Sequence, residues 1–290
     1  MSAVVRDLLG SEAEIMSLGY ATDWVVATSF WFVASLIDQT MPFERDFSPE
    51  DPLISHPHTK GQVTSFANSI LSLGIPFVCF GFAAVTTRSV AEGHHAALGI
   101  WASRGLARMI TVFVKHRVGR LRPDFLARCK WNSVAKACTG KASDIIDGRK
   151  SFPSEHSSTI FAGMAFLSFW LAGKTAAWCF DASLSRRGLL STRLGRLTLT
   201  LLPLFIATWV AITRVEDYRH HKEDVIVGSL IGLSTATLSY LTYWPSPFSR
   251  RNVAENIAGK PRMLYSGSYD DIATNNTYEL TRLEDERETV

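Results

Sequence analysis

The chain has 290 residues, 47% of them hydrophobic, and a formal net charge of only +3. So small a net charge gives no general attraction to nucleic acid, and a nucleic-acid partner is not predicted. The chain has four cysteines, but no Cys/His spacing typical of a zinc site. The distribution of the apolar residues along the chain is more informative than the composition, because these residues lie in long runs and not in amphipathic stripes.

Six apolar segments approach the length of about 20 residues that a helix needs to cross a bilayer. The pattern predicts an all-α integral membrane protein, a bundle of six transmembrane helices. It also predicts a cytosolic segment 1–19, a membrane domain 20–244 and a polar, disordered cytosolic tail 245–290. The six segments are 20–41, 63–86, 94–114, 156–180, 196–213 and 222–244.

The third segment contains Arg104 and Arg108, four residues apart on one face of a helix. Charges within a span usually face the interior of the bundle, so these two are predicted to pair with other helices or with carboxylates of a site. The alternative is a shorter span in which Arg104 extends to the membrane interface.

Basic residues predict the orientation. Arg186, Arg187 and Arg193 follow the fourth span, and Arg250 and Arg251 follow the sixth. Cytosolic loops carry such charges, so the N-terminus is predicted to be cytosolic, with the first span as an uncleaved signal anchor. Three loops then lie on the lumenal or extracellular face: 42–62, 115–155 and 214–221.

The loop 115–155 breaks this rule, because it is the most basic of all. Either the predicted orientation is inverted or these charges are retained for function, and the positions of the other basic loops favour a function. Cys129 and Cys138 lie in the same loop, on the predicted oxidising side, where a disulfide is one possibility. Cys79 and Cys179 fall within spans and are interpreted as small apolar residues. The glycosylation sequon at Asn275 is predicted to be unused, because it falls on the cytosolic side.

Three motifs at the non-cytosolic ends of the spans carry the chemistry. They provide three cations, Lys115, Arg122 and Arg214. Fixed cations stabilise the charge that spreads over the oxygens of a phosphoryl group in its transition state. Taken singly, each is equally well an ordinary charge beside a membrane. The motifs are Lys115-x6-Arg122-Pro123, Pro153-Ser154-x-His156 and Thr213-Arg214-x5-His220-x3-Asp224.

Two histidines add reactive groups. On a helix, His220 and Asp224 would share a face, and a carboxylate on one imidazole nitrogen leaves the other as a nucleophile. His221, three residues before Asp224, is the alternative partner. His156 follows Ser154 at the start of a predicted helix, where free N–H groups favour an anion and a histidine can act as a general acid. A plain helix cap is the alternative for this motif.

In this order and between spans, the three motifs resemble the type-2 phosphatidic acid phosphatase superfamily. The likeness covers about residues 22–244, and the segments 42–52 and 119–126 look most like fungal and plant lipid phosphate phosphatases, including diacylglycerol pyrophosphate phosphatases. The resemblance implies a six-helix membrane fold and a phosphohistidine mechanism without a metal or other cofactor. It further implies phosphate binding by Lys115, Arg122, Ser154 and Arg214, His156 as the acid, and His220 with Asp224 as the nucleophile pair.

The sequence departs from the family pattern at two positions. Thr213 stands where serine is usual and keeps the hydroxyl. Glu155 stands where glycine is usual, and its charge would repel a phosphate unless it turns outward or pairs with Lys115 or a loop arginine. The function predicted is hydrolysis of phosphatidate, lysophosphatidate or diacylglycerol pyrophosphate at the non-cytosolic leaflet. The alternative is a relative weakened by Glu155 that binds lipid or acts as a scaffold.

Overall fold

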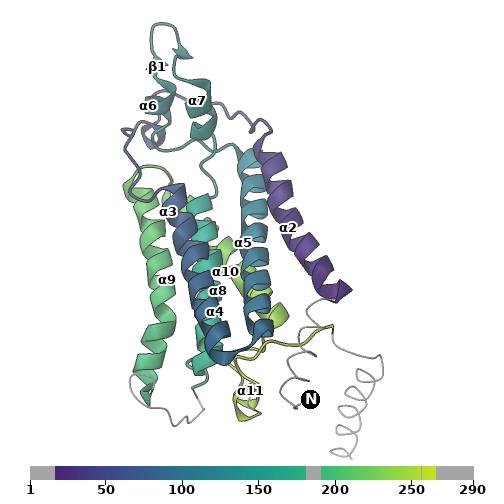
Figure 1. Ribbon diagram of the computed structural model, residues 1–290. Coiled ribbons are helices and arrows are strands. Elements are labelled where there is room, and N and C mark those ends of the chain that lie inside the picture. Colours follow the sequence, from purple (N-terminus) through teal and green to yellow (C-terminus); the bar gives the residue numbers. More distant parts are fainter. Residues whose placement is uncertain (1–16, 181–190, 256, 266–290) are drawn as a thin grey trace, which may run out of the picture.

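The computed structural model describes residues 17–180, 191–255 and 257–265, and within them the chain is mostly helical (Figure 1). Most of the predicted segment 1–19, Arg186 and Arg187, and the sequon at Asn275 lie outside these residues. The long helices are α2 (Leu18–Asp38), α4 (Ile75–Thr87), α5 (Val90–Val118), α8 (Glu155–Thr175), α9 (Arg193–Glu216) and α10 (Lys222–Tyr243).

Five helices in the described part of the chain are long and apolar enough to cross a membrane. One of them, Ser65–Thr87, combines α3 (Ser65–Ser69), a π-helical turn (Ile70–Gly74) and α4. The π turn lies directly before Pro76, whose ring nitrogen has no hydrogen to donate to the helix. Length and composition therefore support five of the six predicted spans, and the exception is the fourth, 156–180.

The helix in this fourth segment is α8, which ends at Thr175 and packs against α5, α9 and α10. Sixteen of its 21 residues are buried, including several serines and glycines. Small residues allow close approach to the neighbouring helices: a Cβ at Gly163 would overlap the carbonyl oxygen of Ser72, and one at Gly232 that of Ser158. Because α8 faces other helices, it can be less apolar than a helix that faces lipid.

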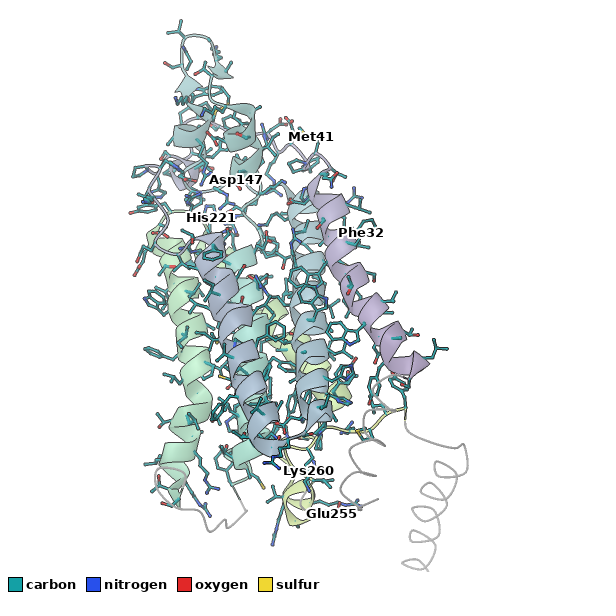
Figure 2. The ribbon with its side chains drawn as sticks, in the orientation of Figure 1. Phe32, Met41, Asp147, His221, Glu255 and Lys260 are labelled. Atoms are coloured by element: carbon teal, nitrogen blue, oxygen red, sulfur yellow. A yellow bond between two sulfur atoms is a disulfide. The ribbon has the colours of Figure 1, made fainter. Side chains whose placement is uncertain are left out.

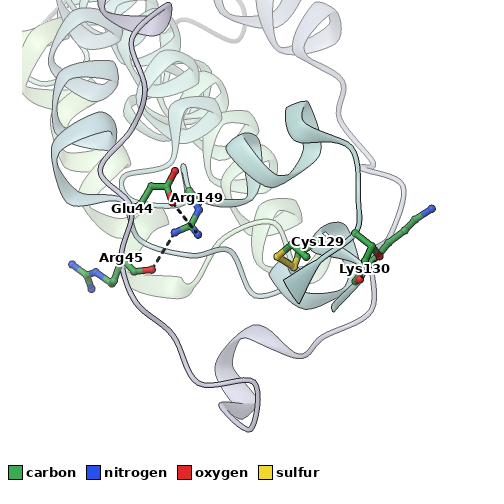
Figure 3. Close-up of a disulfide and its surroundings, with 7 residues drawn as sticks. Glu44, Arg45, Cys129, Lys130 and Arg149 are labelled. Atoms are coloured by element: carbon green, nitrogen blue, oxygen red, sulfur yellow. Dashed lines mark hydrogen bonds and ion pairs between the residues drawn. A yellow bond between two sulfur atoms is a disulfide. The ribbon is translucent and has the colours of Figure 1, made fainter. Parts of the chain in front are cut away.

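A cap lies at one end of the bundle, formed by residues 42–62 and 119–154 (Figure 1). The loop 42–62 contains one short 3-10 turn (Pro52–Ile54) and no other helix or strand. The structure joins Cys129 to Cys138, with the Cα atoms 4.9 Å apart, so the disulfide that the sequence suggested is present (Figure 3). The other cap elements are α6 (Phe125–Cys129), the antiparallel strands β1 (Trp131–Asn132) and β2 (Ala137–Cys138), and α7 (Ala142–Gly148).

Several basic residues of the cap have acidic partners. Arg128 contacts both Asp124 and Asp147. Arg149 lies 3.6 Å from Glu44 and donates a hydrogen bond to the carbonyl oxygen of Arg45 (Figure 3). Each pair fixes the cap to itself or to the neighbouring loop, so these cations serve the local fold as well as the cavity below.

The start of the C-terminal tail differs from the prediction. Residues 245–255 and 257–265 pack at the end of the bundle away from the cap, where Figure 2 labels Glu255 and Lys260. They include α11 (Arg250–Ala254). The N–H of Arg262 donates to the carbonyl of Tyr243 at 2.8 Å, and the Tyr265 hydroxyl donates to Asp23 at 3.0 Å. The tail is polar in composition, but these few contacts with α10 and α2 hold its first part, so a boundary at 245 is too early.

Candidate active site

The three motifs meet at the cap end of the bundle around one cavity of about 830 Å³. Of the seven predicted site residues, five line it: Lys115, Arg122, His156, Arg214 and His220. Ser154 and Asp224 lie behind the wall. Eight basic and three acidic side chains line the cavity, so its charge favours an anion such as phosphate.

His220 lies in the connection between α9 and α10, and not on a helix as predicted, because α10 begins at Lys222. Its Nδ1 lies 2.8 Å from the carbonyl oxygen of Ser151. Asp224 is 3.7 Å from the same nitrogen, beyond hydrogen-bond distance. Since a carbonyl only accepts, Nδ1 must carry the hydrogen. The unprotonated nitrogen is therefore Nε2, whose lone pair accepts a long hydrogen bond of 3.4 Å from a terminal nitrogen of Arg122.

Asp224 supports His220 through its neighbours. This fully buried carboxylate accepts hydrogen bonds from the Ser151 hydroxyl at 2.5 Å, from Arg120 at 2.8 Å and from the His221 N–H at 3.0 Å. It thereby fixes the loop whose carbonyl holds the imidazole. The predicted pair of His220 with Asp224 is therefore present as a 3.7 Å contact, and Ser151 links the two residues through its carbonyl and its hydroxyl.

His221 occupies a different position. It is the N-cap of α10, and it forms a capping box with Asp224 at the third helical position. Its Nε2 lies 3.2 Å from the carbonyl oxygen of Leu53. It is not among the residues that line the cavity. Of the two neighbouring histidines, His220 therefore lines the cavity and His221 does not.

Burial lowers the pKa of His220 to about 3, and the nearby charges of Arg122 and Lys115 act in the same direction. Asp224 opposes this change without reversing it. Desolvation disfavours the charged imidazolium, so the ring is neutral at any physiological pH. A neutral imidazole with a free Nε2 is the nucleophilic form.

Arg122 and Arg214 are held rigidly. Arg122 donates to the carbonyl oxygen of Asp147 at 2.8 Å and to its carboxylate at 2.9 Å. Burial alone would raise the pKa of the Asp147 carboxyl, but Arg122 and Arg128 lower it to about 2. Arg214 donates to the carbonyl of Val63 at 3.0 Å and to Asp217 at 2.8 Å. Rigid cations of this kind need little rearrangement when a phosphate binds.

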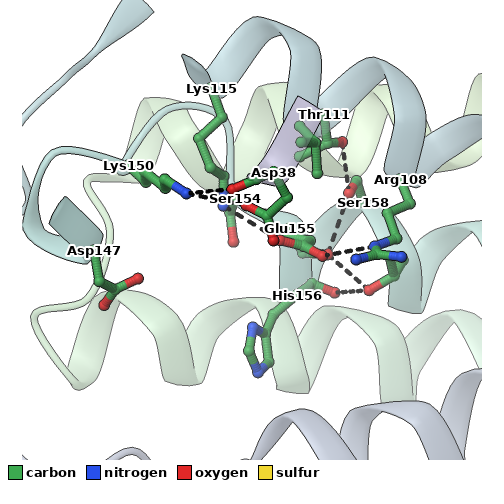
Figure 4. Close-up of polar contacts among 12 residues, drawn as sticks. Asp38, Arg108, Thr111, Lys115, Asp147, Lys150, Ser154, Glu155, His156 and Ser158 are labelled. Atoms are coloured by element: carbon green, nitrogen blue, oxygen red, sulfur yellow. Dashed lines mark hydrogen bonds and ion pairs between the residues drawn. The ribbon is translucent and has the colours of Figure 1, made fainter. Parts of the chain in front are cut away.

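His156 and Ser154 differ in whether their side chains reach the cavity. Ser154 caps α8, and its hydroxyl accepts hydrogen bonds from the N–H and the hydroxyl of Ser157 at 3.4 and 3.0 Å. It is fully buried and does not reach the wall, contrary to the prediction of a phosphate ligand. His156, in the first turn of α8, reaches the wall, and its buried Nε2 has no hydrogen-bond partner within the described residues. Figure 4 shows its ring pointing away from the Glu155 carboxylate.

Glu155 points into the cavity and not outward. One carboxylate oxygen lies 3.5 Å from the Lys115 amine, and the other lies 3.6 Å from Arg108 (Figure 4). The prediction that Arg108 pairs with a carboxylate of the site is confirmed. Arg104 instead donates to the Ser69 hydroxyl at 3.1 Å and lies over the Trp31 ring, 5.7 Å from its centre.

Sequence reasoning missed several residues of the site. Arg219 lines the cavity, and its buried Nε has no hydrogen-bond partner in the part of the chain described here. Its position directly before His220 was the available signal. Lys60 and Asp147 also line the cavity but belong to no motif. Ser151 precedes Pro153 by two residues, but nothing in the sequence indicates that its carbonyl binds His220.

Together these features define a helical membrane protein whose cationic cavity contains two histidines. The PAP2 superfamily matches residues 96–247, which include all seven predicted site residues, and the chain belongs to this family. Lipid phosphate phosphatase 2 of Arabidopsis thaliana is 35% identical over 236 residues, 78% of each chain. The probable diacylglycerol pyrophosphate phosphatase 1 of Schizosaccharomyces pombe is 35% identical over 231 residues, 73% of this chain and 76% of that protein.

A third relative, diacylglycerol pyrophosphate phosphatase 1 of Saccharomyces cerevisiae, is 33% identical over 222 residues. The match covers 70% of this chain and 72% of that protein. No solved structure matches the chain significantly. The family resemblance that the motifs indicated is confirmed, and it places the chain among lipid phosphate phosphatases and their relatives.

Proposed function

We propose that the protein is a membrane lipid phosphate phosphatase that works without a metal, through a phosphohistidine at His220. The observation that carries this proposal is the Nε2 of His220, neutral and unprotonated, beside Arg122 in a cationic cavity. The substrates proposed are phosphatidate, lysophosphatidate and diacylglycerol pyrophosphate, in line with the names of the relatives.

In the first step, the Nε2 of His220 attacks phosphorus and the bond from phosphorus to the leaving oxygen breaks. Burial lowers the pKa of His156 to about 4 in the free cavity, and a negative phosphate bound beside it favours the protonated ring. His156 then donates this proton to the leaving oxygen, so the lipid leaves as an alcohol or, from a diphosphate, as a phosphate monoester. The imidazole then carries phosphorus on Nε2 and hydrogen on Nδ1. The Ser151 carbonyl and the nearby Asp224 stabilise the positive charge that results.

In the second step, water attacks the phosphorus of the phosphohistidine. His156 takes a proton from this water, the bond from phosphorus to nitrogen breaks, and inorganic phosphate leaves. Arg122, Arg214 and Lys115 hold the phosphoryl oxygens in both steps. His220 and His156 return to their starting protonation, so the atoms and protons balance over one turnover.

The shape of the cavity supports a lipid substrate. Its lining extends from the cap to Arg104, which lies eleven residues before Lys115 on α5, or about 16 Å along a helix. Trp31 of α2 and Ser69 of α3 also line it, so the cavity extends between two helices classed as candidate membrane spans. We infer that the phosphate binds at the cap end while the glycerol backbone and acyl chains extend toward the bilayer. With the orientation of the spans that the basic residues predict, the active site then faces the lumen, a vacuole or the exterior.

Phosphate release in the absence of metal tests the proposal. The purified protein in detergent should release inorganic phosphate from phosphatidate in excess EDTA at the rate seen without chelator. A strict requirement for Mg²⁺ would contradict the phosphohistidine scheme. Binding of phosphatidate without any phosphate release would favour the alternative of a lipid-binding relative, for which the contact of Glu155 with Lys115 is the supporting observation.

The low pKa of His220 predicts a specific pH profile. An ordinary histidine nucleophile would lose activity below about pH 6.5, because protonation occupies its lone pair. With a folded pKa of about 3, His220 remains neutral as the pH falls from 8 to 5. We therefore expect kcat/KM, corrected for the second ionisation of the substrate phosphate, not to decline through this range because of the nucleophile. A corrected acid limb near pH 6.5 that moves in variants of Ser151 would contradict this expectation.

A further inference from the structure

Glu155 lies between the phosphate end of the cavity and its membrane end. Its carboxylate bridges two cations of α5: Lys115, which is near the proposed phosphate, and Arg108, seven residues earlier in the chain. Arg104 lies one further turn away. A group that extends from the phosphate along α5 must therefore pass this carboxylate.

The position of His156 indicates which part of a substrate lies there. Glu155 and His156 are consecutive residues in the first turn of α8, and both line the cavity. If His156 protonates the leaving oxygen, that oxygen lies close to the first turn of α8. The substrate atom that is bonded to it, on the side away from the phosphorus under attack, then also lies close to this turn. In a phosphomonoester this atom is an uncharged carbon. In a diphosphate it is a second phosphorus that carries negative oxygens.

The Glu155 carboxylate resembles a second phosphate in its contacts. Each of its two oxygens faces one cation, at 3.5 and 3.6 Å, which is how a phosphate oxygen pair would face Lys115 and Arg108 (Figure 4). A second phosphate would have to displace this carboxylate or lie against it, and like charges at short distance repel. The glycerol carbon of a monoester meets no such repulsion.

We propose that Glu155 makes this site select phosphomonoester lipids over lipid diphosphates. This inference rests on the phosphatase function proposed above and deepens it. Without the carboxylate, Lys115 and Arg108 would be free to bind the second phosphate. Arg104, which is 6% exposed and forms no ion pair within 4 Å among the described residues, would add a further positive charge behind them.

The test compares initial rates with phosphatidate and with diacylglycerol pyrophosphate of the same acyl chains, using the full-length protein in detergent. For the diphosphate, the first phosphate released is followed. The wild type should prefer phosphatidate. Glu155→Gln keeps the size of the side chain and removes its charge, and should raise the ratio of kcat/KM for diphosphate over monophosphate at least tenfold. The rates for both substrates can rise, because Lys115 no longer contacts a carboxylate. Only their ratio measures the effect of the substitution on the second phosphate.

Matched variants make the result specific. Glu155→Asp keeps the charge and should leave the ratio within about threefold of the wild type. Glu44→Gln removes a carboxylate that contacts Arg149 in the cap, away from the cavity lining, and should leave the ratio unchanged. Adding Arg108→Gln to Glu155→Gln should abolish the gain. Should the glutamine variant fail to fold, Glu155→Gly serves instead, with the same expected increase.

A wild type that prefers the diphosphate, or a ratio that does not rise in Glu155→Gln or Glu155→Gly, would overturn this proposal while leaving the phosphatase function intact. Failure of the phosphatase function would be seen differently, because the wild type would then release phosphate from neither lipid.

Discussion

His220→Ala is expected to abolish phosphate release, with a loss of at least about 10⁴-fold, because among the described residues only His220 combines an unprotonated imidazole nitrogen with contact to Arg122. The measurement is kcat for phosphatidate, together with trapping of the phosphorylated enzyme from substrate labelled in its phosphate. The wild type should form a phosphoprotein that is stable in alkali and labile in acid. His220→Ala should form none.

His221→Ala is the matched control, since it removes the neighbouring imidazole. It also removes one part of the α10 capping box, so a modest loss of stability, about 1 kcal/mol, is expected. Phosphoprotein formation should persist. If the labelled phosphoprotein vanished in His221→Ala and survived in His220→Ala, the nucleophile assignment would be wrong.

The His–Asp motif shows which part of the site geometry the sequence predicts and which part it does not. The spacing of His220 and Asp224 predicts a direct pair only if both residues are on one helix. In the structure the helix begins two residues after His220, and Asp224 instead completes a capping box with His221. The three-residue interval between His221 and Asp224 is the usual N-cap to N3 spacing, so the sequence contained this signal as well.

The role of Ser151 could not be predicted, for a physical reason. Its contribution to His220 is a backbone carbonyl, which every residue has, so no residue type marks it. Only the path of the chain between α7 and α8 brings that oxygen to the imidazole. Side-chain patterns, by contrast, predicted that Lys115, Arg122, His156, Arg214 and His220 share a site, because cations and imidazoles at helix ends are unusual enough to be informative.

The prediction of the membrane-spanning helices from the sequence is limited in a similar way. Apolar runs predicted the helices that face outward, where side chains such as Phe82, Phe205 and Leu238 are exposed on the bundle surface. They served less well for α8, because a helix surrounded by other helices needs small residues more than apolar ones. The same reasoning applies to Glu155. Its residue type suggested either an outward position or an ion pair, and only the positions of Lys115 and Arg108 on α5 distinguished the two.

His156→Ala is expected to lower kcat for phosphatidate by about 10²–10⁴-fold, the range typical of a general acid. The alkoxide of a glycerol lipid is a poor leaving group, so it needs the proton that His156 would supply. A substrate that leaves as a stabilised anion, such as para-nitrophenyl phosphate, does not need that proton. For such a substrate the first step, followed as the burst of phenolate release, should slow by less than tenfold.

The contrast between the two substrates separates proton donation from a role in shaping the cavity. Loss of the ring would also remove a half-buried side chain from the first turn of α8, and a purely structural effect should slow both substrates alike. Burst amplitude should remain near one phenolate per enzyme in His156→Ala, because the phosphohistidine still forms while its hydrolysis, which also uses His156, is slow. Equal losses for the two substrates, with no burst, would mean that His156 holds the phosphate or the helix and transfers no proton.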